Sequence, residues 1–273
     1  MRIALGVQYD GSAYCGWQIQ PNQPTVQFIL EDAITKFIGN AEPVRVTAAG
    51  RTDTGVHALG QVVHFDAAVE RDSWSWIRGI NTFLPSDVVV NWAKQVPNEF
   101  DARFSAKART YIYALFAGPT RSPILYQRYG YQMMPAGQWF DVSQMRTAAN
   151  HLLGEHDFSS FRASECQSKT PIKYLYECAI VDQQPFLYFK VRANAFLHHM
   201  VRNMVGSLLH IGQGRQNNEW IKTVLQGKNR DLAAPTFSPD GLYLVEVSYP
   251  DELEIPKPHI QNAGLPKELM LSV

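Results

Sequence analysis

The chain contains little cysteine, and its few thiols do not form a recognisable framework. The three cysteines, Cys15, Cys166 and Cys178, are odd in number and lack the paired spacing of zinc ligands. A disulfide-rich scaffold and a structural zinc site are therefore not expected, and a reducing cytoplasm fits best. No uncharged apolar run approaches the roughly 18–20 residues of a membrane span. The N-terminus has no cleavable signal pattern, so we expect a cytoplasmic protein without membrane contact.

Charge is also scarce, and it cancels. Charged residues make up 18% of the chain, and 25 basic side chains balance 25 acidic ones. A globally basic nucleic-acid binder is thereby excluded. Two local surpluses remain, with five basic against one acidic residue over 101–130 and seven against one over 190–230. Such clusters are typical of a surface that binds a polyanion, although basic residues scattered over solvated faces explain the counts equally well.

Apolar periodicity predicts the same order of strands and helices twice. In residues 1–104, a strand-like alternation over 3–9 precedes a helical stripe that ends before Gly39. Residues 108–249 repeat the order and add a long apolar helix, and residues 250–273 form an irregular, proline-containing tail. We therefore expect an α+β fold of two ferredoxin-like split β-α-β halves. The halves are expected to join into an extended, mostly antiparallel sheet with a central active-site cleft.

One polar loop in the first half has the composition of a catalytic site. Two glycines, Gly50 and Gly55, flank the polar run from Arg51 to Thr54, between two predicted strands. Asp53 is ionised at neutral pH, and a nearby Arg51 keeps it so even when it is partly desolvated. An ionised carboxylate of this kind is what a nucleophile or a general base requires. A polar hairpin with an Asx-turn is the alternative.

Other candidate motifs favour structural interpretations. His57 and His64 fit partly buried imidazoles better than general bases. His198 and His199 are adjacent in a predicted helix, where their side chains would diverge by about 100° and could not easily share a metal ion. The chain has no Walker lysine, dinucleotide fingerprint or serine elbow. We therefore predict neither a metal site nor a nucleotide cofactor.

Aromatic and basic residues alternate where the second half begins. Tyr111 is two positions from Arg109, an arrangement that would place a stacking ring beside a phosphate contact. A strand whose tyrosines pack against neighbouring side chains is the alternative. Arg202 lies within the apolar helix, where its charge needs a partner or an opening to water. Pairing with Asp53 across a cleft would satisfy both charges.

Several segments together resemble the bacterial tRNA pseudouridine synthase A family. They run from the first strand to the last and are specific in their order and spacing, with no departure in the Asp53 loop. The matching stretches are Tyr9-Asp10-Gly11, Gly16-Trp17-Gln18, Ala49-Gly50-Arg51-Thr52-Asp53, Gly55-Val56-His57, Phe104-Ser105-Ala106, Arg109-Thr110-Tyr111, Leu153-Gly154-Glu155-His156-Asp157-Phe158, Ala193 to Asn203 and Gly241-Leu242-Tyr243-Leu244-Val245.

The resemblance implies an isomerase that converts uridine to pseudouridine in the tRNA anticodon stem-loop, at positions 38, 39 and 40. It implies a homodimer without metal or cofactor. Asp53 aligns with the catalytic aspartate, Tyr111 with an active-site tyrosine, and Arg202 with the partner of the carboxylate. Arg51 aligns with a residue that helps to hold the extruded nucleotide, and Leu242 with an apolar residue at the site.

Three further basic residues, Arg109, Lys107 and Arg78, are candidate contacts to the RNA backbone. Two alternatives to the isomerase stay open: a non-catalytic RNA-binding module of the same fold, and a carboxylate-based nucleoside hydrolase. The hydrolase is weaker because no second catalytic carboxylate is evident.

Overall fold

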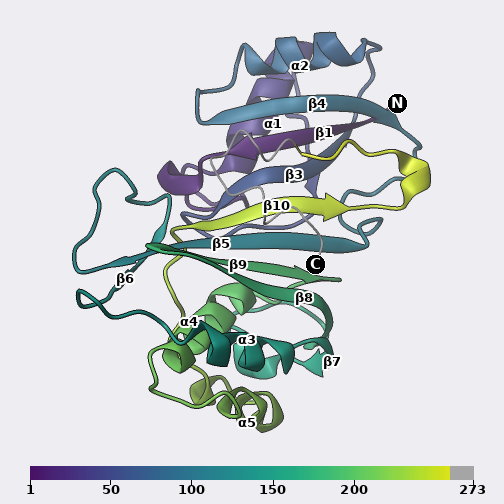
Figure 1. Ribbon diagram of the computed structural model, residues 1–273. Coiled ribbons are helices and arrows are strands. Elements are labelled where there is room, and N and C mark those ends of the chain that lie inside the picture. Colours follow the sequence, from purple (N-terminus) through teal and green to yellow (C-terminus); the bar gives the residue numbers. More distant parts are fainter. Residues whose placement is uncertain (259–273) are drawn as a thin grey trace. The chain divides into compact units, whose positions relative to one another are not determined.

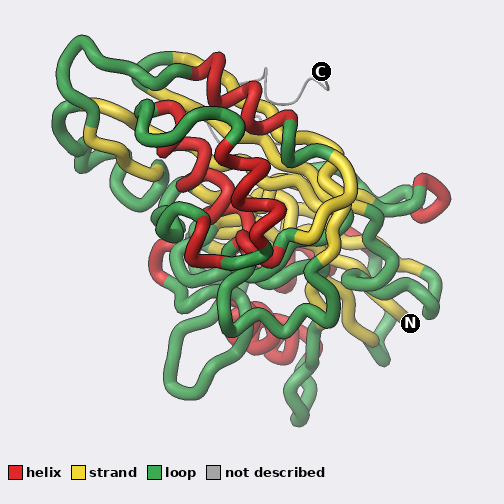
Figure 2. The backbone as a smooth tube through the Cα atoms, turned by 90° about the horizontal axis from the view of Figure 1, so that it is seen from below, coloured by secondary structure: helices red, strands yellow, loops and turns green. Residues whose placement is uncertain are grey.

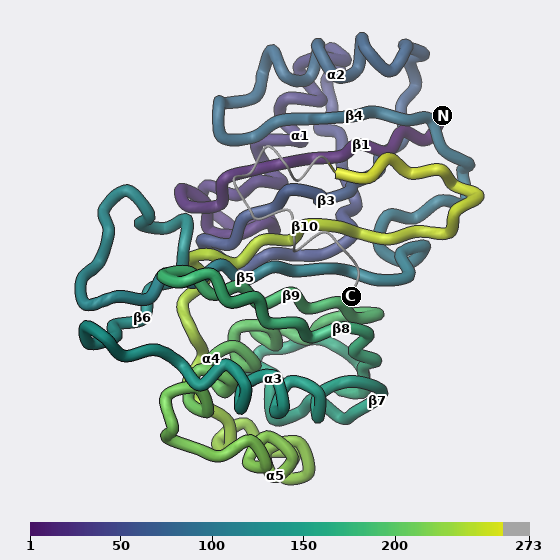
Figure 3. Tube along the Cα trace, viewed as in Figure 1, coloured from purple at the N-terminus to yellow at the C-terminus, as the bar shows by residue number. Residues whose placement is uncertain are grey.

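A computed structural model describes residues 1–258 of the chain, whose elements are labelled in Figure 1. These residues form two compact units. The first contains residues 1–107 and 243–258, and the second contains residues 108–242. Figure 3 follows the course of the chain from the N-terminus to the C-terminus.

The first unit is a mostly antiparallel sheet with two helices. Its strands lie in the order β4-β1-β3-β10, and the short β2 also pairs with β3. The pairs of β1 with β3 and β4 are antiparallel, whereas β10 runs parallel to β3. The elements are β1 (Arg2–Tyr9), α1 (Val26–Ile38), β2 (Thr47–Ala48), β3 (His57–Asp66), α2 (Ser73–Asn81), β4 (Val88–Val96) and β10 (Leu242–Ser248), with 3-10 turns at Gly11–Ala13 and Asp251–Leu253.

Local sequence signals set the ends of the two helices in this unit. Gly39 follows α1 with a φ of 75°, the left-handed conformation that glycine adopts at little cost. The side chain of Asp72 accepts a hydrogen bond from the backbone N–H of Ser75 and so caps the start of α2. Trp76 on α2 is buried and packs edge-on against Phe37 and Phe65, which holds α2 and α1 against the sheet.

The second unit is a mostly antiparallel sheet with three helices. Its strands lie in the order β5-β9-β8-β7, and β6 pairs parallel with β5. Figure 2 shows the helices of this unit as a layer in front of its strands. The elements are β5 (Ala108–Gly118), β6 (Gly130–Met133), α3 (Val142–Asn150), β7 (Gly154–Asp157), β8 (Ile172–Gln183), β9 (Phe186–Ala193), α4 (Met200–Gly212) and α5 (Trp220–Gly227), with 3-10 turns at Ser159–Phe161 and Arg230–Leu232.

The α+β fold class with mostly antiparallel pairing is confirmed. The division between the halves falls at residue 107, close to the expected position, but the last strand groups with the first unit. Tyr243 and Leu244 pair with His57 and Ala58 of β3, which accounts for that grouping. Of the expected tail, residues 250–258 hold one 3-10 turn, and residues 259–273 lie outside the described part. No helix within residues 1–258 is long and apolar enough to cross a membrane.

The segment before the Asp53 loop forms less strand than its sequence favours. Val44 and Val46 alternate with polar residues, a pattern typical of a strand, yet only Thr47 and Ala48 form β2. The backbone N–H of Val44 donates to the Thr35 hydroxyl at 2.9 Å, and that of Val46 donates to the buried Glu31 carboxylate at 3.0 Å. Side chains of α1 therefore take the hydrogen bonds that a neighbouring strand would otherwise make.

Candidate active site

The Asp53 loop connects β2 to β3 and ends in a tight turn. The backbone N–H of Val56 donates to the carbonyl oxygen of Asp53 at 3.1 Å, which closes a four-residue turn. Gly55, the third residue of that turn, has a φ of 78°. This value belongs to a type II turn and explains why glycine stands there. The turn therefore fixes the backbone of Asp53 by local hydrogen bonding.

A second segment, residues 9–17, packs against the loop and holds it on both sides of Asp53. The hydroxyl groups of Tyr9 and Thr52 lie 2.8 Å apart, and both side chains are buried. The backbone N–H of Trp17 donates to the Thr52 carbonyl at 3.0 Å. After Asp53, the N–H of Gly55 donates to the carbonyl of Tyr14 at 3.3 Å. The residues that bracket the carboxylate are thus fixed from outside the loop.

Two glycines allow this close approach. A Cβ on Gly11 would lie 2.0 Å from the Val56 carbonyl oxygen, and one on Gly16 would lie 2.7 Å from the Thr52 carbonyl oxygen. Gly16 also has a φ of 83°. A larger residue at either position would push the loop away. Both glycines belong to the stretches that carry the family resemblance, so those stretches support the loop physically.

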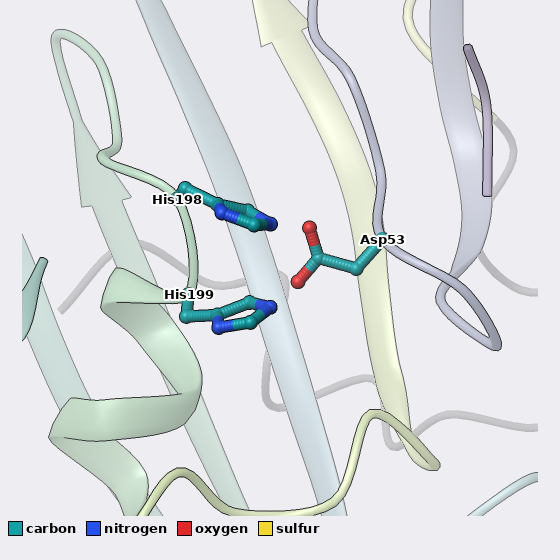
Figure 4. Close-up of side chains that lie close together, drawn as sticks. All are labelled: Asp53, His198 and His199. Atoms are coloured by element: carbon teal, nitrogen blue, oxygen red, sulfur yellow. The ribbon is translucent and has the colours of Figure 1, made fainter. Parts of the chain in front are cut away.

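The side chains of the loop alternate in exposure. Arg51 is exposed, Thr52 is buried and Asp53 is half-buried. Thr52 therefore anchors the loop in the core, while Arg51 and Asp53 stay accessible to a ligand. Figure 4 shows the Asp53 carboxylate projecting from the loop.

The side chains of His57 and His64 are buried, as the favoured interpretation predicted. The Nδ1 atom of His57 accepts the backbone N–H of Gly11 at 3.1 Å, and its ring stacks on Tyr243 with centroids 4.6 Å apart. The Nδ1 atom of His64 accepts the N–H of Ala102 at 3.0 Å. Burial lowers the pKa of His64, so the neutral imidazole is favoured. Each ring therefore connects β3 to another segment of the first unit.

The second unit carries Tyr111 near the start of β5. Its ring is mostly buried, lies opposite Val191 of β9, and meets Phe196 edge-to-face with centroids 5.1 Å apart. The neighbouring Arg109 donates from Nη1 to the carbonyl of Asn194 at 3.0 Å. The segment after β9 therefore holds both the aromatic and the basic residue that the sequence singled out.

Arg202 and Leu242 also belong to the second unit. The Nε atom of Arg202 donates to the Phe237 carbonyl at 2.8 Å, and the Phe237 N–H donates back to the Arg202 carbonyl at 3.4 Å. This contact supplies one partner for a half-buried charge in an apolar helix. Leu242 is buried, and its N–H donates to Pro239 at 3.0 Å. The pairing of Arg202 with Asp53 stays a prediction.

The expectation for the two adjacent histidines was wrong in its geometry. His198 and His199 precede α4 instead of lying within it, because His199 has a φ of 63° and the helix begins at Met200. Their ring centroids lie 3.9 Å apart, and Figure 4 shows the two rings side by side. The two side chains therefore do not diverge as they would within a helix. The absence of a metal ion stays a prediction.

The candidate residues divide between the two units. Arg51 and Asp53 belong to the first unit, whereas Tyr111, Arg202 and Leu242 belong to the second. The remaining candidate contacts, Lys107 and Arg78, are exposed side chains of the first unit. Sequence reasoning missed the roles of Tyr9 and Thr52. Both stand in the motifs of the resemblance, but nothing in those motifs shows that the two hydroxyl groups meet.

Comparisons with known proteins point to one family. Residues 6–105 and 148–250 match the family model described as tRNA pseudouridine synthase. A protein named tRNA pseudouridine synthase A from Polynucleobacter asymbioticus is 62% identical over 99% of both chains. Another of that name from Paraburkholderia phytofirmans is 56% identical over 97% of this chain and 95% of its own. A crystal structure of a Cbf5-Nop10-Gar1 complex aligns at 10% identity over 76% of this chain and 45% of that chain, with a TM-score of 0.35.

The match to the family model covers most of the chain, and the motifs that hold the Asp53 loop lie inside it. The identity to the curated relatives extends over almost the full length of both partners. The chain therefore belongs to the tRNA pseudouridine synthase family.

Proposed function

We propose that the protein converts uridine to pseudouridine in the tRNA anticodon stem-loop, at positions 38, 39 and 40, with Asp53 as the reacting carboxylate. The observation that carries this proposal is the half-buried Asp53 in a loop fixed on both sides by the segment from Tyr9 to Trp17. A carboxylate that must act on a sugar needs such a fixed position, because small displacements of a reacting group are costly.

The reaction balances without an outside reagent. The bond between N1 of uracil and C1′ of ribose breaks, and a bond between C5 and C1′ forms. C5 loses a proton, and N1 gains one. No electrons enter or leave, so the reaction needs positioning and exclusion of water but no redox cofactor.

Asp53 acts on the ribose in one of two ways. Its carboxylate attacks the anomeric carbon as a nucleophile, or it removes a ribose proton as a base. Either role requires the ionised form of the carboxylate. In this proposal the Arg202 guanidinium stabilises the carboxylate.

Tyr111 and Leu242 bind the uracil ring, and Arg51 holds the extruded nucleotide. A paired uridine must leave its stack before the carboxylate can reach C1′, at a cost of a few kcal/mol. Stacking on Tyr111 recovers roughly 1–3 kcal/mol. Arg109, Lys107 and Arg78 contribute contacts to phosphate, which are salt-dependent and are compatible with zero net charge.

Further features of the proposal come from the family resemblance. The enzyme is expected to work in the cytoplasm as a homodimer that binds one tRNA across both subunits, without a metal ion or cofactor. These features stay predictions, because neither the fold nor the geometry of the Asp53 loop tests them.

A tritium-release assay tests the function. Unmodified tRNA that carries 5-tritiated uridine is incubated with the protein, and pseudouridine is then mapped in the product. The proposal predicts tritium release that matches new pseudouridine at positions 38, 39 and 40. An RNA-binding module would bind tRNA without releasing tritium, and a nucleoside hydrolase would release free uracil.

A further inference from the structure

A long part of the second unit contains no acidic residue. Residues 108–140 include three basic side chains, Arg109, Arg121 and Arg128, but no aspartate or glutamate. In a protein whose charges cancel overall, such a stretch creates a local positive potential. The middle of the stretch, residues 119–129, is a loop that connects β5 to β6; we name it the β5–β6 arm.

Both ends of the β5–β6 arm are fixed to the sheet. The arm leaves β5 at Gly118 and returns at Gly130, and Figure 3 shows it as an extended loop between the two strands. Gly130 pairs with Leu115, and Met133 pairs with Gly118, in parallel register. The arm therefore projects from a rigid base.

The tip of the arm is ordered by its own backbone. The N–H groups of Arg128 and Tyr129 both donate to the Leu125 carbonyl at 3.1 Å. Two apolar side chains on this tip point to solvent: Ile124 is 87% exposed, and Tyr126 is 62% exposed. An exposed tyrosine ring held on an ordered turn offers a face on which a base or ribose of a bound RNA can stack.

A basic side chain of the arm is held against its base. The guanidinium carbon of Arg121 lies 5.8 Å from the centroid of the Tyr131 ring. That ring stacks on Phe116 at 6.3 Å, and its hydroxyl donates to the Gly118 carbonyl at 3.1 Å. Arg121 remains exposed, as does Arg128. Stacking on an aromatic ring orients a guanidinium while leaving its N–H donors available to a phosphate.

We propose that the β5–β6 arm is a second contact surface for the tRNA, with Arg121 on a phosphate and Tyr126 against a base or ribose. The proposal rests on the proposed function, because it takes tRNA as the substrate. Tyr111 and Gly118 stand seven residues apart on β5, so the arm lies about 23 Å from the stacking tyrosine along the strand. The contact is thus to RNA at a distance from the reacting uridine, and it adds affinity for longer substrates.

A second copy of the chain is the competing occupant. In a symmetric dimer contact, the same surface of each subunit would meet itself. If the two arms faced each other across that surface, Arg121 and Arg128 would bring like charges together without a carboxylate from either arm. A polyanion matches this composition, so the charge pattern favours RNA.

The test measures RNA affinity, with the full-length protein and a tRNA transcript. Arg121→Gln combined with Tyr126→Ala is compared with wild type and with Lys36→Gln, which removes one positive charge from an exposed position on α1. The expected result is at least a fivefold higher Kd for the arm variant. Losing one phosphate contact should also make the plot of log association constant against log salt concentration less steep by about 0.9. A truncated anticodon hairpin too short to reach the arm should bind wild type and variant equally.

Two results would overturn the proposal. One is an unchanged Kd and salt slope for full-length tRNA in the arm variant. The other is dissociation of an oligomer on the same substitutions, measured by light scattering, which would assign the arm to a contact between copies. Because affinity is measured instead of turnover, a failure of Asp53 as the catalytic group would leave this test unaffected.

Discussion

The hydroxyl groups of Tyr9 and Thr52 lie 2.8 Å apart in the core of the first unit. Thr52 immediately precedes Asp53, the candidate catalytic residue. Tyr9 is the last residue of β1, and Thr52 lies in the loop between β2 and β3. Burial raises the pKa of Tyr9, so the phenol keeps its proton at any physiological pH. The pair is therefore a neutral hydrogen bond that connects the end of β1 to Thr52, the residue before Asp53.

Replacing Tyr9 by Phe should slow turnover more than it destabilises the fold. Loss of one such hydrogen bond costs about 1 kcal/mol of unfolding free energy. A loop that holds a reacting group less firmly is expected to lose about tenfold to a hundredfold in kcat. Urea unfolding and single-turnover rates check both values. Thr52→Ser keeps the hydroxyl and should retain most activity; equal rates for Y9F and wild type would remove the positioning role.

Gly16→Ala and Gly39→Ala form a matched pair. Both glycines have positive φ, 83° and 75°, so alanine strains each backbone by about 1–2 kcal/mol. Only at Gly16 does the added Cβ meet the Thr52 carbonyl oxygen, since nothing lies within 4 Å at Gly39. Turnover on tRNA should fall sharply for G16A and little for G39A. Similar activity in the two variants would show that the contact does not position the loop.

Substitutions at Tyr111 can distinguish stacking of its ring on a bound base from packing of the ring within the fold. Phe keeps the ring and its edge-to-face contact with Phe196, so most of the turnover should remain. Ala removes a stacking partner worth roughly 1–3 kcal/mol per base and should severely impair activity. Because the side chain is mostly buried, Tyr111→Leu serves as the fold control. Leu should unfold near the wild-type temperature while showing at least a tenfold lower rate. Normal turnover in either Leu or Ala would refute stacking.

The buried His64 should make the free energy of unfolding depend on pH. Burial lowers its pKa in the folded protein, so below its ordinary pKa of about 6.5 the unfolded chain binds more protons than the folded one. The free energy of unfolding should therefore fall as pH decreases from about 7 towards 5. His64→Asn, which keeps an acceptor for the Ala102 N–H, should flatten this dependence in urea titrations. An identical pH slope in the variant would contradict the assignment.

Local signals predicted the helices well because they depend on nearby residues. Asp141 stands directly before the apolar stripe of α3, and its side chain caps the helix by accepting the Gln144 N–H at 3.0 Å. The start of α4 was misplaced, because apolar spacing runs through Leu197 although the backbone reverses at His199. The short strands β6 and β7 were missed, since each has only four residues and depends on a neighbouring strand.

The sequence was enough to propose Asp53 as a candidate, but it did not show which residues hold the Asp53 loop in place. Asp53 stands out because a polar run between two glycines is visible in the sequence. The contacts that hold it join residues up to 43 positions apart, and such pairs are set by the tertiary structure. The arrangement of the two halves about a cleft stays a prediction.

The central claim is that Asp53 carries out the chemistry, and Asp53→Asn tests it most directly. Asparagine keeps the size of the side chain but removes its charge and most of its basicity. Tritium release from 5-tritiated tRNA should be abolished in D53N, while tRNA affinity stays within about twofold. Thr54→Ala, an exposed neighbour in the same turn, should remain active. Tritium release by D53N at a rate near that of wild type would contradict the account.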